Sequence, residues 1–301
     1  MQTTRCRWLT ALALALGVLA VGGCGDDKKS ASSSPATTTT AAQPSQSFAA
    51  NTKMAKLQKA GEITIGVKFD VAPFGRKDPK SGDVEGFDID LAKAIADELG
   101  VKPKYIEALS DNRIAFLKDG TADLILSTMT INAERDQEID FSEPYFVAHG
   151  RILVKKDSAI TGVKGLAGKK VCTALGSTYV DTLKKQAPKA DTKLVDSYSE
   201  CLELIQDGAV DAVATDDVIL TGMVIQDDTL KLVGDELTTE PYGVGIKQGD
   251  KDFKTFVDGV VADYKKDGRW ATAYQKWVGQ YTGEKQDPPT MTLREAIDLS
   301  K

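Results

Sequence analysis

Histidine is almost absent from this sequence, cysteine is scarce, and no apolar run after residue 25 is long enough to span a membrane. His149 is the only histidine among 301 residues, and the four cysteines are Cys6, Cys24, Cys172 and Cys201. Zinc sites need several such side chains at short spacings, so we expect no metal centre and no other cofactor. The same shortage leaves no evident Ser–His or Cys–His pair for nucleophilic catalysis, and we expect a protein that is not an enzyme.

Basic residues are also in deficit. The chain has 38 Lys and Arg against 44 Asp and Glu, a formal net charge of −6. Loss of residues 1–23 would remove Arg5 and Arg7 and no acid, which leaves 36 − 44 = −8. An acidic body argues against a nucleic-acid partner. It also makes any buried arginine informative, because the overall charge does not account for it.

The N-terminus has the pattern of an exported lipoprotein. Arg5 and Arg7 precede the apolar run Trp8–Val21, whose fourteen residues suit a signal peptide and are too few to span a bilayer. The run ends in the letters VGGC, which resemble a bacterial lipobox with cleavage before Cys24 and lipid on its sulfur. We therefore expect residues 1–23 to be a lipoprotein signal peptide. The alternative is an ordinary signal peptide with an incidental cysteine.

Residues 24–50 combine this lipid anchor with a segment rich in Ser, Thr, Ala and Pro. Such a composition buries too little apolar surface to offset the entropy cost of ordering, so it predicts a disordered tether. The expected location is the extracytoplasmic face of the cell membrane, with the lipid holding the protein there.

Cys172 and Cys201 remain once the signal peptide and the lipidated cysteine are set aside. An even pair of cysteines in an exported chain favours a disulfide. The alternative is two buried thiols.

The body of the chain alternates short β runs with helical patterns. In the first part the expected elements are strands at 62–67, 104–108 and 122–126 and helices at 89–99 and 113–118. In the second part they are strands at 170–173, 193–195 and 210–214 and helices at 179–186 and 199–206. This alternation is typical of a mainly parallel sheet covered by helices, so the expected fold class is α/β.

A faint internal repeat suggests two lobes of similar build. Residues 117–124 (LKDGTADL) match residues 205–212 (IQDGAVDA) at an offset of 88. Ligands of open α/β sheets bind beyond the carboxyl ends of the strands, here Ser127-Thr128 and Thr215-Asp216, so these ends would face a cleft. Residues 147–154 and 237–246 are the candidate crossings between lobes, which would form a hinge.

The expected boundaries follow from these crossings. The first lobe would comprise residues 51–148 plus 242–282, and the second lobe residues 149–241. Residues 283–301 would be a loosely attached C-terminal tail.

Six short motifs lie in order along residues 62–280, namely APF at 72–74, GFDIDLA at 86–92, NRI at 112–114, TINAER at 130–135, DFSEPY at 140–145 and GST at 176–178. Together they resemble the bacterial extracellular solute-binding proteins of the polar amino-acid type, family 3. Cys172 and Cys201 also resemble the cysteine pair of glutamate-binding lipoproteins from Gram-positive bacteria. The resemblance implies a two-lobed, periplasmic-binding-protein-like fold of type II with two hinge crossings, and an ABC importer as partner.

A free amino acid carries a carboxylate and an ammonium, and a buried cleft must match both. The resemblance assigns the carboxylate to Arg135, whose guanidinium can form two parallel hydrogen bonds, with help from Thr128 and Thr130. From the sequence alone, Arg135 could instead be a surface arginine paired with a neighbouring acid. The ammonium is assigned to Asp216 at the end of the second-lobe strand, although Asp217 competes for that role.

Ser177 and Thr178 follow a glycine at an expected helix start, where exposed N–H groups favour an anion. The resemblance places this turn at the ligand, and simple N-capping is the alternative.

Lys68, Ser110 and Arg113 are expected to bind the ligand side chain. Lys68 follows the first strand, and Ser110 with Arg113 resembles the Ser-x-x-Arg of glutamate and aspartate binders. Two cations beside a side-chain carboxylate favour glutamate or aspartate. The alternatives are a solvated lysine and an arginine paired with Asp111. Many relatives carry aromatic residues at the positions of Val71 and Ser110, but this chain has neither. The lack of these aromatic residues suits a ligand that is held by charge.

The sequence therefore predicts a monomeric receptor that binds an acidic amino acid, L-glutamate before L-aspartate, and delivers it to the transmembrane subunits of an ABC permease. The first alternative is a receptor for glutamine or another polar amino acid. A dehydratase-like enzyme on the same fold and a surface adhesin or sensor are the others.

Overall fold

The computed structural model describes residues 46–301. The predicted signal peptide, the lipidation site at Cys24 and most of the predicted tether lie outside the described residues. The end of the predicted tether is described, and Phe48 packs there on Phe256 of the first lobe with ring centres 5.4 Å apart, so the expectation of disorder as far as residue 50 is wrong. Within residues 46–301, no helix combines the length and the apolar character that a membrane span requires.

The first lobe is built around a five-stranded sheet with the order β5-β1-β6-β14-β7. Strand β1 pairs in parallel with β5 and β6, while β14 runs antiparallel to β6 and β7. The strands are β1 (Glu62–Val67), β5 (Lys102–Glu107), β6 (Leu124–Leu126), β7 (Asp140–Phe141) and β14 (Gly245–Ile246). A small separate sheet follows β1 and contains β2 (Asp70–Val71), β3 (Gly75–Lys77) and β4 (Val84–Glu85).

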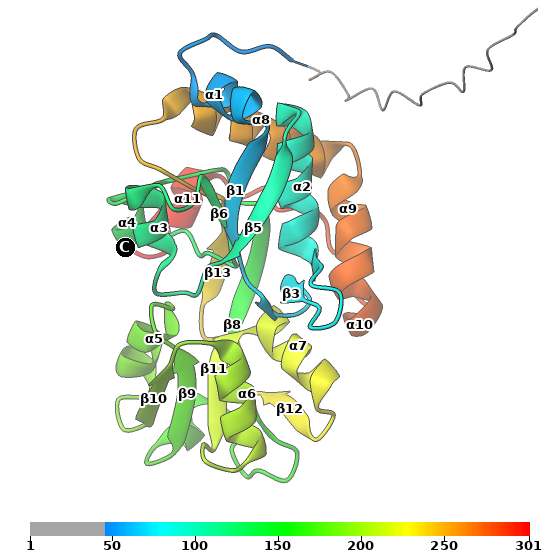
Figure 1. Ribbon diagram of the computed structural model, residues 1–301. Coiled ribbons are helices and arrows are strands. Elements are labelled where there is room, and N and C mark those ends of the chain that lie inside the picture. The colour runs from blue at the N-terminus through cyan, green and yellow to red at the C-terminus, as the bar shows by residue number, and fades with distance from the viewer. Residues whose placement is uncertain (1–45) are drawn as a thin grey trace, which may run out of the picture. The chain divides into compact units, whose positions relative to one another are not determined.

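Helices cover this sheet, and they come from both ends of the described chain (Figure 1). They are α1 (Lys53–Ala60), α2 (Phe87–Leu99), α3 (Arg113–Asp119), α4 (Ala133–Asp136), α8 (Lys251–Lys266), α9 (Arg269–Tyr274), the π-helix η2 (Gln275–Gly279), α10 (Gln280–Thr282) and α11 (Leu293–Asp298). Helix α2 buries one whole face, with Leu91, Ile95 and Leu99 fully enclosed, as its four-residue spacing predicts.

The second lobe contains a sheet with the order β10-β9-β11-β8-β12, to which β13 adds by pairing with β8. Strands β9, β10 and β11 are parallel, and β8 is antiparallel to its neighbours. The strands are β8 (Phe146–Lys155), β9 (Lys170–Ala174), β10 (Asp191–Val195), β11 (Ala212–Asp216), β12 (Leu230–Val233) and β13 (Thr239–Tyr242). Around it lie η1 (Val163–Leu166), α5 (Tyr179–Gln186), α6 (Tyr198–Gln206) and α7 (Asp217–Gln226). The α/β class predicted from the sequence is confirmed.

Two extended segments, which lie side by side, join the lobes. The start of β8 pairs antiparallel with β13, so that Phe146 lies opposite Tyr242 and His149 opposite Thr239. The lobe boundaries expected at residues 148–149 and 241–242 fall within these two strands. Paired crossings of this kind can bend together while both sheets stay intact.

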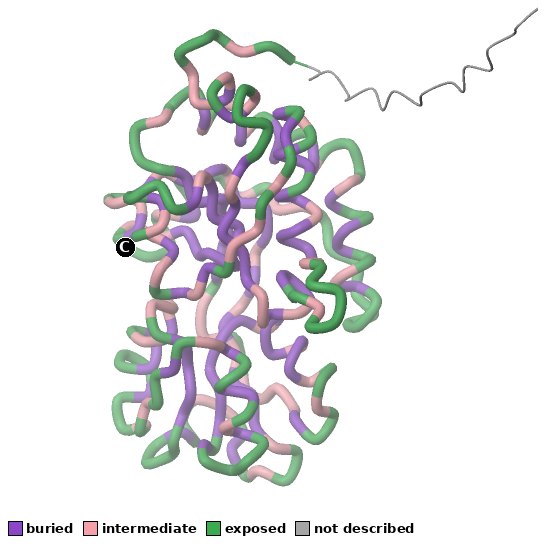
Figure 2. Tube along the Cα trace, in the orientation of Figure 1, coloured by how far each residue is buried: buried purple, intermediate pink, exposed green. Residues whose placement is uncertain are grey.

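Aromatic side chains fill the first lobe next to the crossings. The Phe74 ring lies 4.9 Å from Phe146 and 5.3 Å from Phe87, and Phe87 lies 5.7 Å from Trp270. Trp270 Nε1 donates a hydrogen bond to the Tyr145 carbonyl at 2.6 Å. Figure 2 shows buried chain along the strands of both lobes and exposed chain on the outer faces of the helices.

The C-terminal tail is more firmly attached than the sequence suggested. Ala296 of α11 is fully buried, and Leu293 and Ile297 pack on the same apolar cluster of the first lobe. The Leu293 amide donates to Glu143 Oε2 at 2.7 Å, and Ser300 Oγ accepts from the Ala133 amide at 2.8 Å. The expectation of loose attachment is therefore wrong for this helix, because its short apolar stripe finds a partner surface 150 residues away in the sequence.

Candidate functional site

A small polar cavity lies between the lobes, where strands of both sheets end. Its lining residues are Ser110, Arg113, Thr128, Thr130, Arg135, Ser177, Thr178, Tyr179, Tyr198, Asp216 and Ile219. Eight of the nine predicted ligand-binding residues are in this set. The ninth, Lys68, is buried directly behind it and donates to Ser110 Oγ at 3.0 Å. Wider hollows on the described surface, such as the groove lined by Asp90, Lys93 and Arg269, have partly or fully exposed charged walls.

The signature helix α2 holds the strand end of the first lobe in place. Gly86 precedes α2 with φ 145°, and an added Cβ there would lie 2.1 Å from the Phe74 carbonyl oxygen. The buried Asp88 accepts from the Thr128 amide at 2.9 Å and from the Tyr145 hydroxyl at 2.8 Å. Burial raises the pKa of Asp88 to about 7. This carboxyl group therefore fixes the turn after β6 from beneath the cavity.

That turn has an unusual backbone. Thr128 has φ 43°, the only positive φ of a non-glycine residue among residues 46–301. A β-branched residue adopts this conformation only where its surroundings enforce it, and such positions are common at binding sites. The hydrogen bond to Asp88 is the enforcing contact. No role was predicted for Asp88, although the GFDID motif contains it.

The two cavity arginines are buried and point inward. Arg135 lies on α4 and is 8% exposed. It donates to the Thr130 carbonyl at 2.8 Å and to the Gly176 carbonyl at 3.0 Å. Arg113 is 2% exposed and donates to the Ser110 and Ser127 carbonyls at 3.1 and 2.9 Å. Burial lowers the pKa of Arg135, and burial together with the Arg135 charge lowers that of Arg113 to about 9.

Neither arginine forms a salt bridge with a described carboxylate. The alternatives in which Arg135 pairs with an adjacent acid on the surface, and Arg113 pairs with Asp111, are therefore wrong. Both guanidinium groups instead donate hydrogen bonds to the Gly176 carbonyl, which belongs to the second lobe. Two planar cations at one cavity wall favour an anionic group beside them.

Lys68 is a third buried cation. Its side chain is 1% exposed, and its ammonium lies 5.8 Å from the centre of the Tyr198 ring. Burial, followed by the Arg113 charge, lowers the pKa of Lys68 from 10.5 to about 7. The alternative of a solvated loop lysine is wrong, because the strand end is enclosed by Ser110 and the second lobe.

The second lobe contributes the opposite charge. Asp216 ends β11, is 4% exposed, and accepts from the Tyr179 and Tyr242 hydroxyls at 2.8 and 2.7 Å. Burial, then the nearby Glu240 charge, raises the pKa of Asp216 to about 8. A bound ammonium would favour the ionised form of this carboxyl group.

Asp217, the competing acid, faces another way. Its Oδ1 accepts from the His149 and Val218 amides at 3.1 and 2.8 Å, and its Oδ2 lies 3.6 Å from His149 Nδ1. Its side chain is 31% exposed and does not line the cavity. Of the two aspartates, Asp216 is the one at the cavity.

Glu240 is a buried acid that the sequence did not single out. It lies on β13, is 2% exposed, and its Oε2 accepts from Thr130 Oγ1 at 2.6 Å and from Thr178 Oγ1 at 3.0 Å. Thr178 therefore directs its hydroxyl at Glu240 instead of capping α5, while Ser177 Oγ lies 3.3 Å from Thr173 Oγ1. One crossing strand thus holds a hydroxyl from each lobe.

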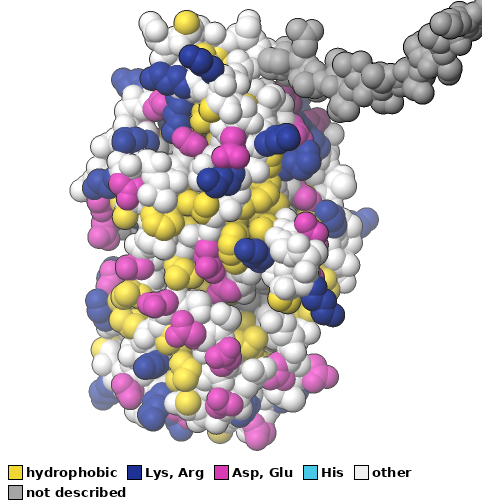
Figure 3. All heavy atoms as spheres, in the orientation of Figure 1, with side chains coloured by type: hydrophobic (Ala, Val, Ile, Leu, Met, Phe, Trp, Pro, Cys, Tyr) yellow, Lys and Arg dark blue, Asp and Glu magenta, His cyan; other side chains and the backbone are white. Residues whose placement is uncertain are grey.

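The cavity therefore presents charges of both signs from opposite sides. Lys68, Arg113 and Arg135 come from the first lobe, Asp216 from the second and Glu240 from a crossing strand; fully ionised, the sum is 3 − 2 = +1. By contrast, acidic and basic side chains are intermixed on the outer face drawn in Figure 3. Charges of both signs in one buried cavity suit a small molecule that itself carries both.

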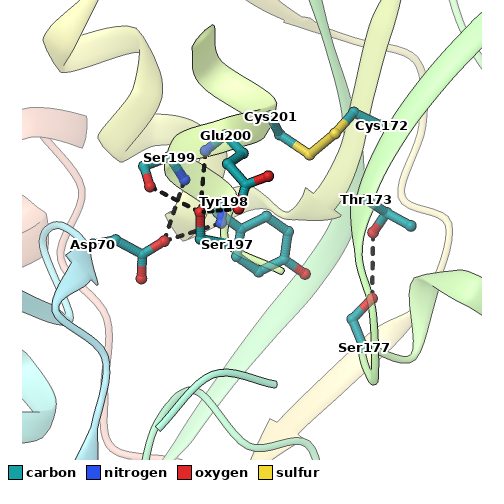
Figure 4. Close-up of a disulfide and its surroundings, with 9 residues drawn as sticks. All are labelled: Asp70, Cys172, Thr173, Ser177, Ser197, Tyr198, Ser199, Glu200 and Cys201. Atoms are coloured by element: carbon teal, nitrogen blue, oxygen red, sulfur yellow. Dashed lines mark hydrogen bonds between the residues drawn. A yellow bond between two sulfur atoms is a disulfide. The ribbon is translucent and has the colours of Figure 1, made fainter. Parts of the chain in front are cut away.

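Cys172 and Cys201 form a disulfide, as predicted. The bond ties β9 to α6, three residues after Tyr198 (Figure 4). The Tyr198 ring faces the Lys68 ammonium. Tyr198 and Tyr179 were missed by the sequence reasoning, because they come from helix starts in the second lobe and carry no local motif.

Several known proteins resemble this chain over most of its length. The ABC transporter glutamine-binding protein GlnH of Bacillus subtilis (strain 168) is 39% identical to this chain, over 78% of it and 85% of the relative. The glutamate-binding protein GluB of Corynebacterium glutamicum is 30% identical, over 74% and 79%. A solved structure of an ancestral arginine-binding protein bound to glutamine is 38% identical, with a TM-score of 0.69 over 73% of this chain and 98% of that one.

These likenesses confirm the two-lobed type II fold, and the relatives are binding proteins, in agreement with the expectation that the chain is not an enzyme. Residues 63–280 match the sequence profile of the same family that the motifs resemble. The chain belongs to the bacterial extracellular solute-binding proteins, family 3.

Proposed function

We propose that the protein is the extracytoplasmic receptor of an ABC amino-acid importer and that it binds L-glutamine between its lobes, with L-glutamate as the second candidate. The observation that carries the proposal is that Arg135 and Asp216, from different lobes, both line one buried cavity. A free amino acid is the simplest small metabolite with a carboxylate for one and an ammonium for the other.

The main-chain groups of the ligand would be held as follows. The carboxylate would accept hydrogen bonds from Arg135 and the Thr130 hydroxyl, and the ammonium would donate to Asp216. Each charge-assisted hydrogen bond contributes about 1.5–3 kcal/mol, so this part of the site supplies most of the affinity for any α-amino acid. Glu240 would orient Thr130 and Thr178 toward this end of the ligand.

The side chain of the ligand would point at Lys68, Ser110 and Arg113. These groups supply several donors and one hydroxyl acceptor, which suits an amide as well as a carboxylate. The glutamine-binding name of the 39% identical relative, and glutamine in the 38% identical structure, favour the amide over the acid. This reverses the order in which the sequence analysis placed the two ligands.

A specific observation keeps glutamate as the second candidate. Lys68 is buried without a salt bridge to any described carboxylate, and Arg113 lies close enough to lower its pKa. A side-chain carboxylate of the ligand would neutralise this pair, and the 30% identical relative is named as a glutamate-binding protein.

The family and the N-terminal pattern support a proposal for how the protein is anchored and for its partner. We propose that lipid on Cys24 holds the receptor at the outer face of the cell membrane through the tether that follows Cys24. The monomeric receptor would then release its ligand to the transmembrane subunits of the permease.

The test is a thermal-shift screen of the twenty amino acids, followed by calorimetry on those that stabilise the protein. A ligand at a hundred times its Kd adds about 2.7 kcal/mol of stability, or a Tm rise of roughly 5–10 °C for a protein of this size. Glutamine should give such a rise, glutamate a smaller or equal one. If no amino acid raises the Tm, the proposal fails.

Arg135→Ala should then weaken binding of both amino acids by at least about 100-fold, because it removes two charge-assisted hydrogen bonds. The matched control is Arg294→Ala, whose side chain is 79% exposed on α11 and far from the cavity lining. Equal affinity of the Arg135→Ala variant and the control would refute the assignment of the carboxylate.

A further inference from the structure

The loop at 68–74, which follows β1 and contains the two-residue strand β2, contacts the second lobe through the backbone next to Tyr198, one of the lining residues. Asp70, in this loop, accepts hydrogen bonds at its Oδ2 from the Tyr198 amide at 3.0 Å and the Ser199 amide at 3.2 Å. These two amides belong to residues 128 and 129 positions later in the sequence. Figure 4 shows the Asp70 carboxylate facing the start of α6. The contact joins the two lobes without any ligand atom.

The chemistry of this contact is that of a helix start capped from another part of the protein. Ser197 accepts from the Glu200 amide within α6, and Asp70 satisfies the two amides before it. An anion at a helix N-terminus gains from the helix dipole as well as from the hydrogen bonds. The disulfide at Cys201 ties α6 to β9, so the amides belong to a fixed part of the second lobe.

A second helix approaches the same loop through a glycine. A Cβ added at Gly222, in the interior of α7, would lie 1.7 Å from the Ala72 carbonyl oxygen and 2.8 Å from the Ala72 carbonyl carbon. Glycine inside a helix is about 1 kcal/mol less favourable than alanine. Here its lack of a side chain is what lets α7 lie against the loop.

We propose that Asp70, Ala72, the first turn of α6 and Gly222 form a closing contact, which stabilises the lobes in their closed arrangement and thereby sets the affinity for every ligand of the cavity. The affinity of a two-state receptor depends on how readily the binding-competent arrangement forms. Separation of the lobes would expose the Asp70 carboxylate and the two α6 amides to water. None of these groups belongs to the set proposed to hold the ligand, so the closing contact acts on closure instead of selectivity.

The experiment compares Asp70→Ala and Gly222→Ala with the wild type, and it rests on the proposed function for its ligands. We expect both variants to bind glutamine and glutamate about 10- to 100-fold more weakly, because charge-assisted hydrogen bonds or close packing are lost only when the lobes are together. The loss should appear as faster dissociation in stopped-flow measurements. The Kd ratio of the two amino acids should stay unchanged in Gly222→Ala.

Gly259→Ala is the matched control. Gly259 lies in helix α8, and an added Cβ there meets no atom within 4 Å. Both glycine replacements favour their helices, so both variants should fold with an unchanged or higher Tm, and only Gly222→Ala should lose affinity. Small-angle scattering without added ligand should give a larger radius of gyration for Asp70→Ala and Gly222→Ala than for the control.

Unchanged affinity in Asp70→Ala and Gly222→Ala would overturn the closing contact. A changed Kd ratio in Gly222→Ala would overturn the claim that the closing contact leaves the selectivity between glutamine and glutamate unaffected. If the wild type binds no amino acid, the proposed function fails, and the scattering comparison alone then decides on the closing contact, which equal radii would refute.

Discussion

Lys68 should make glutamate binding depend on pH in a way that glutamine binding does not. Burial and the neighbouring Arg113 lower the pKa of Lys68 to about 7. At pH 6 about nine-tenths of these side chains carry a proton, and at pH 8 only about one-tenth do. A glutamate side-chain carboxylate beside Lys68 would raise that pKa again, because an opposite charge favours the protonated form.

The magnitude follows directly. Glutamate binding should take up about 0.9 of a proton at Lys68 at pH 8 and about 0.1 at pH 6. Glutamine brings no charge to Lys68 and should take up much less. Asp216, with its pKa raised to about 8, must release a proton when the ammonium of either ligand binds, so it cancels in the comparison. Above pH 7, the affinity for glutamate should fall relative to that for glutamine by up to about tenfold per pH unit.

Calorimetry at pH 6 and pH 8 in two buffers with different ionisation enthalpies measures the proton uptake for each amino acid. Lys68→Met keeps an unbranched side chain of similar length and removes the titrating group, so the difference between the two ligands should vanish. Equal proton uptake for glutamate and glutamine in the wild type at pH 8 would refute this reasoning, and so would a difference that persists in Lys68→Met.

Three further outcomes are expected. Replacing Cys172 and Cys201 by serine should lower the free energy of unfolding by about 2–4 kcal/mol in urea titrations, because the disulfide restricts the unfolded chain; an unchanged midpoint would contradict this. The raised pKa of Asp88 makes the folded state bind more protons than the unfolded state between about pH 4 and 7, so stability should fall as pH rises through this window, and Asp88→Asn should remove that slope. The Asp217 carboxylate, 3.6 Å from His149 Nδ1, raises the pKa of His149, so its stabilisation should be complete below about pH 6.5 and lost as pH rises through the higher folded-state pKa. Thermal melts of His149→Gln across this range should lack that loss, and an identical pH profile would refute it.

Much of the architecture could be predicted because its signals are local. The four-residue spacing of Leu91, Ile95 and Leu99 places one face of α2 in the core, and the structure buries all three. The ends of the two repeated strand units, at Thr128 and Asp216, do meet at one cavity. The sequence motifs also led to the prediction of Arg135 at this cavity. The short capped helix α4 fixes the direction of the Arg135 side chain.

The parts that could not be predicted depend on contacts between distant segments. Glu240 and Thr130 are 110 residues apart, and Asp70 and Tyr198 are 128 residues apart. No spacing or periodicity in the sequence predicts either contact. Nothing local distinguishes Asp216 from Asp217, and only the hydroxyls of two tyrosines in the fold direct the first one inward. The α11 helix was underestimated for the same reason, because its apolar stripe is short and its partner surface lies far away in the sequence.

A crystal structure of the protein with bound glutamine would test the proposed binding mode directly. We expect the α-carboxylate within hydrogen-bond distance of the Arg135 guanidinium, the ammonium at Asp216, and the side-chain amide toward Lys68 and Ser110. A ligand bound outside this cavity, or one whose ammonium faces the arginines, would contradict it.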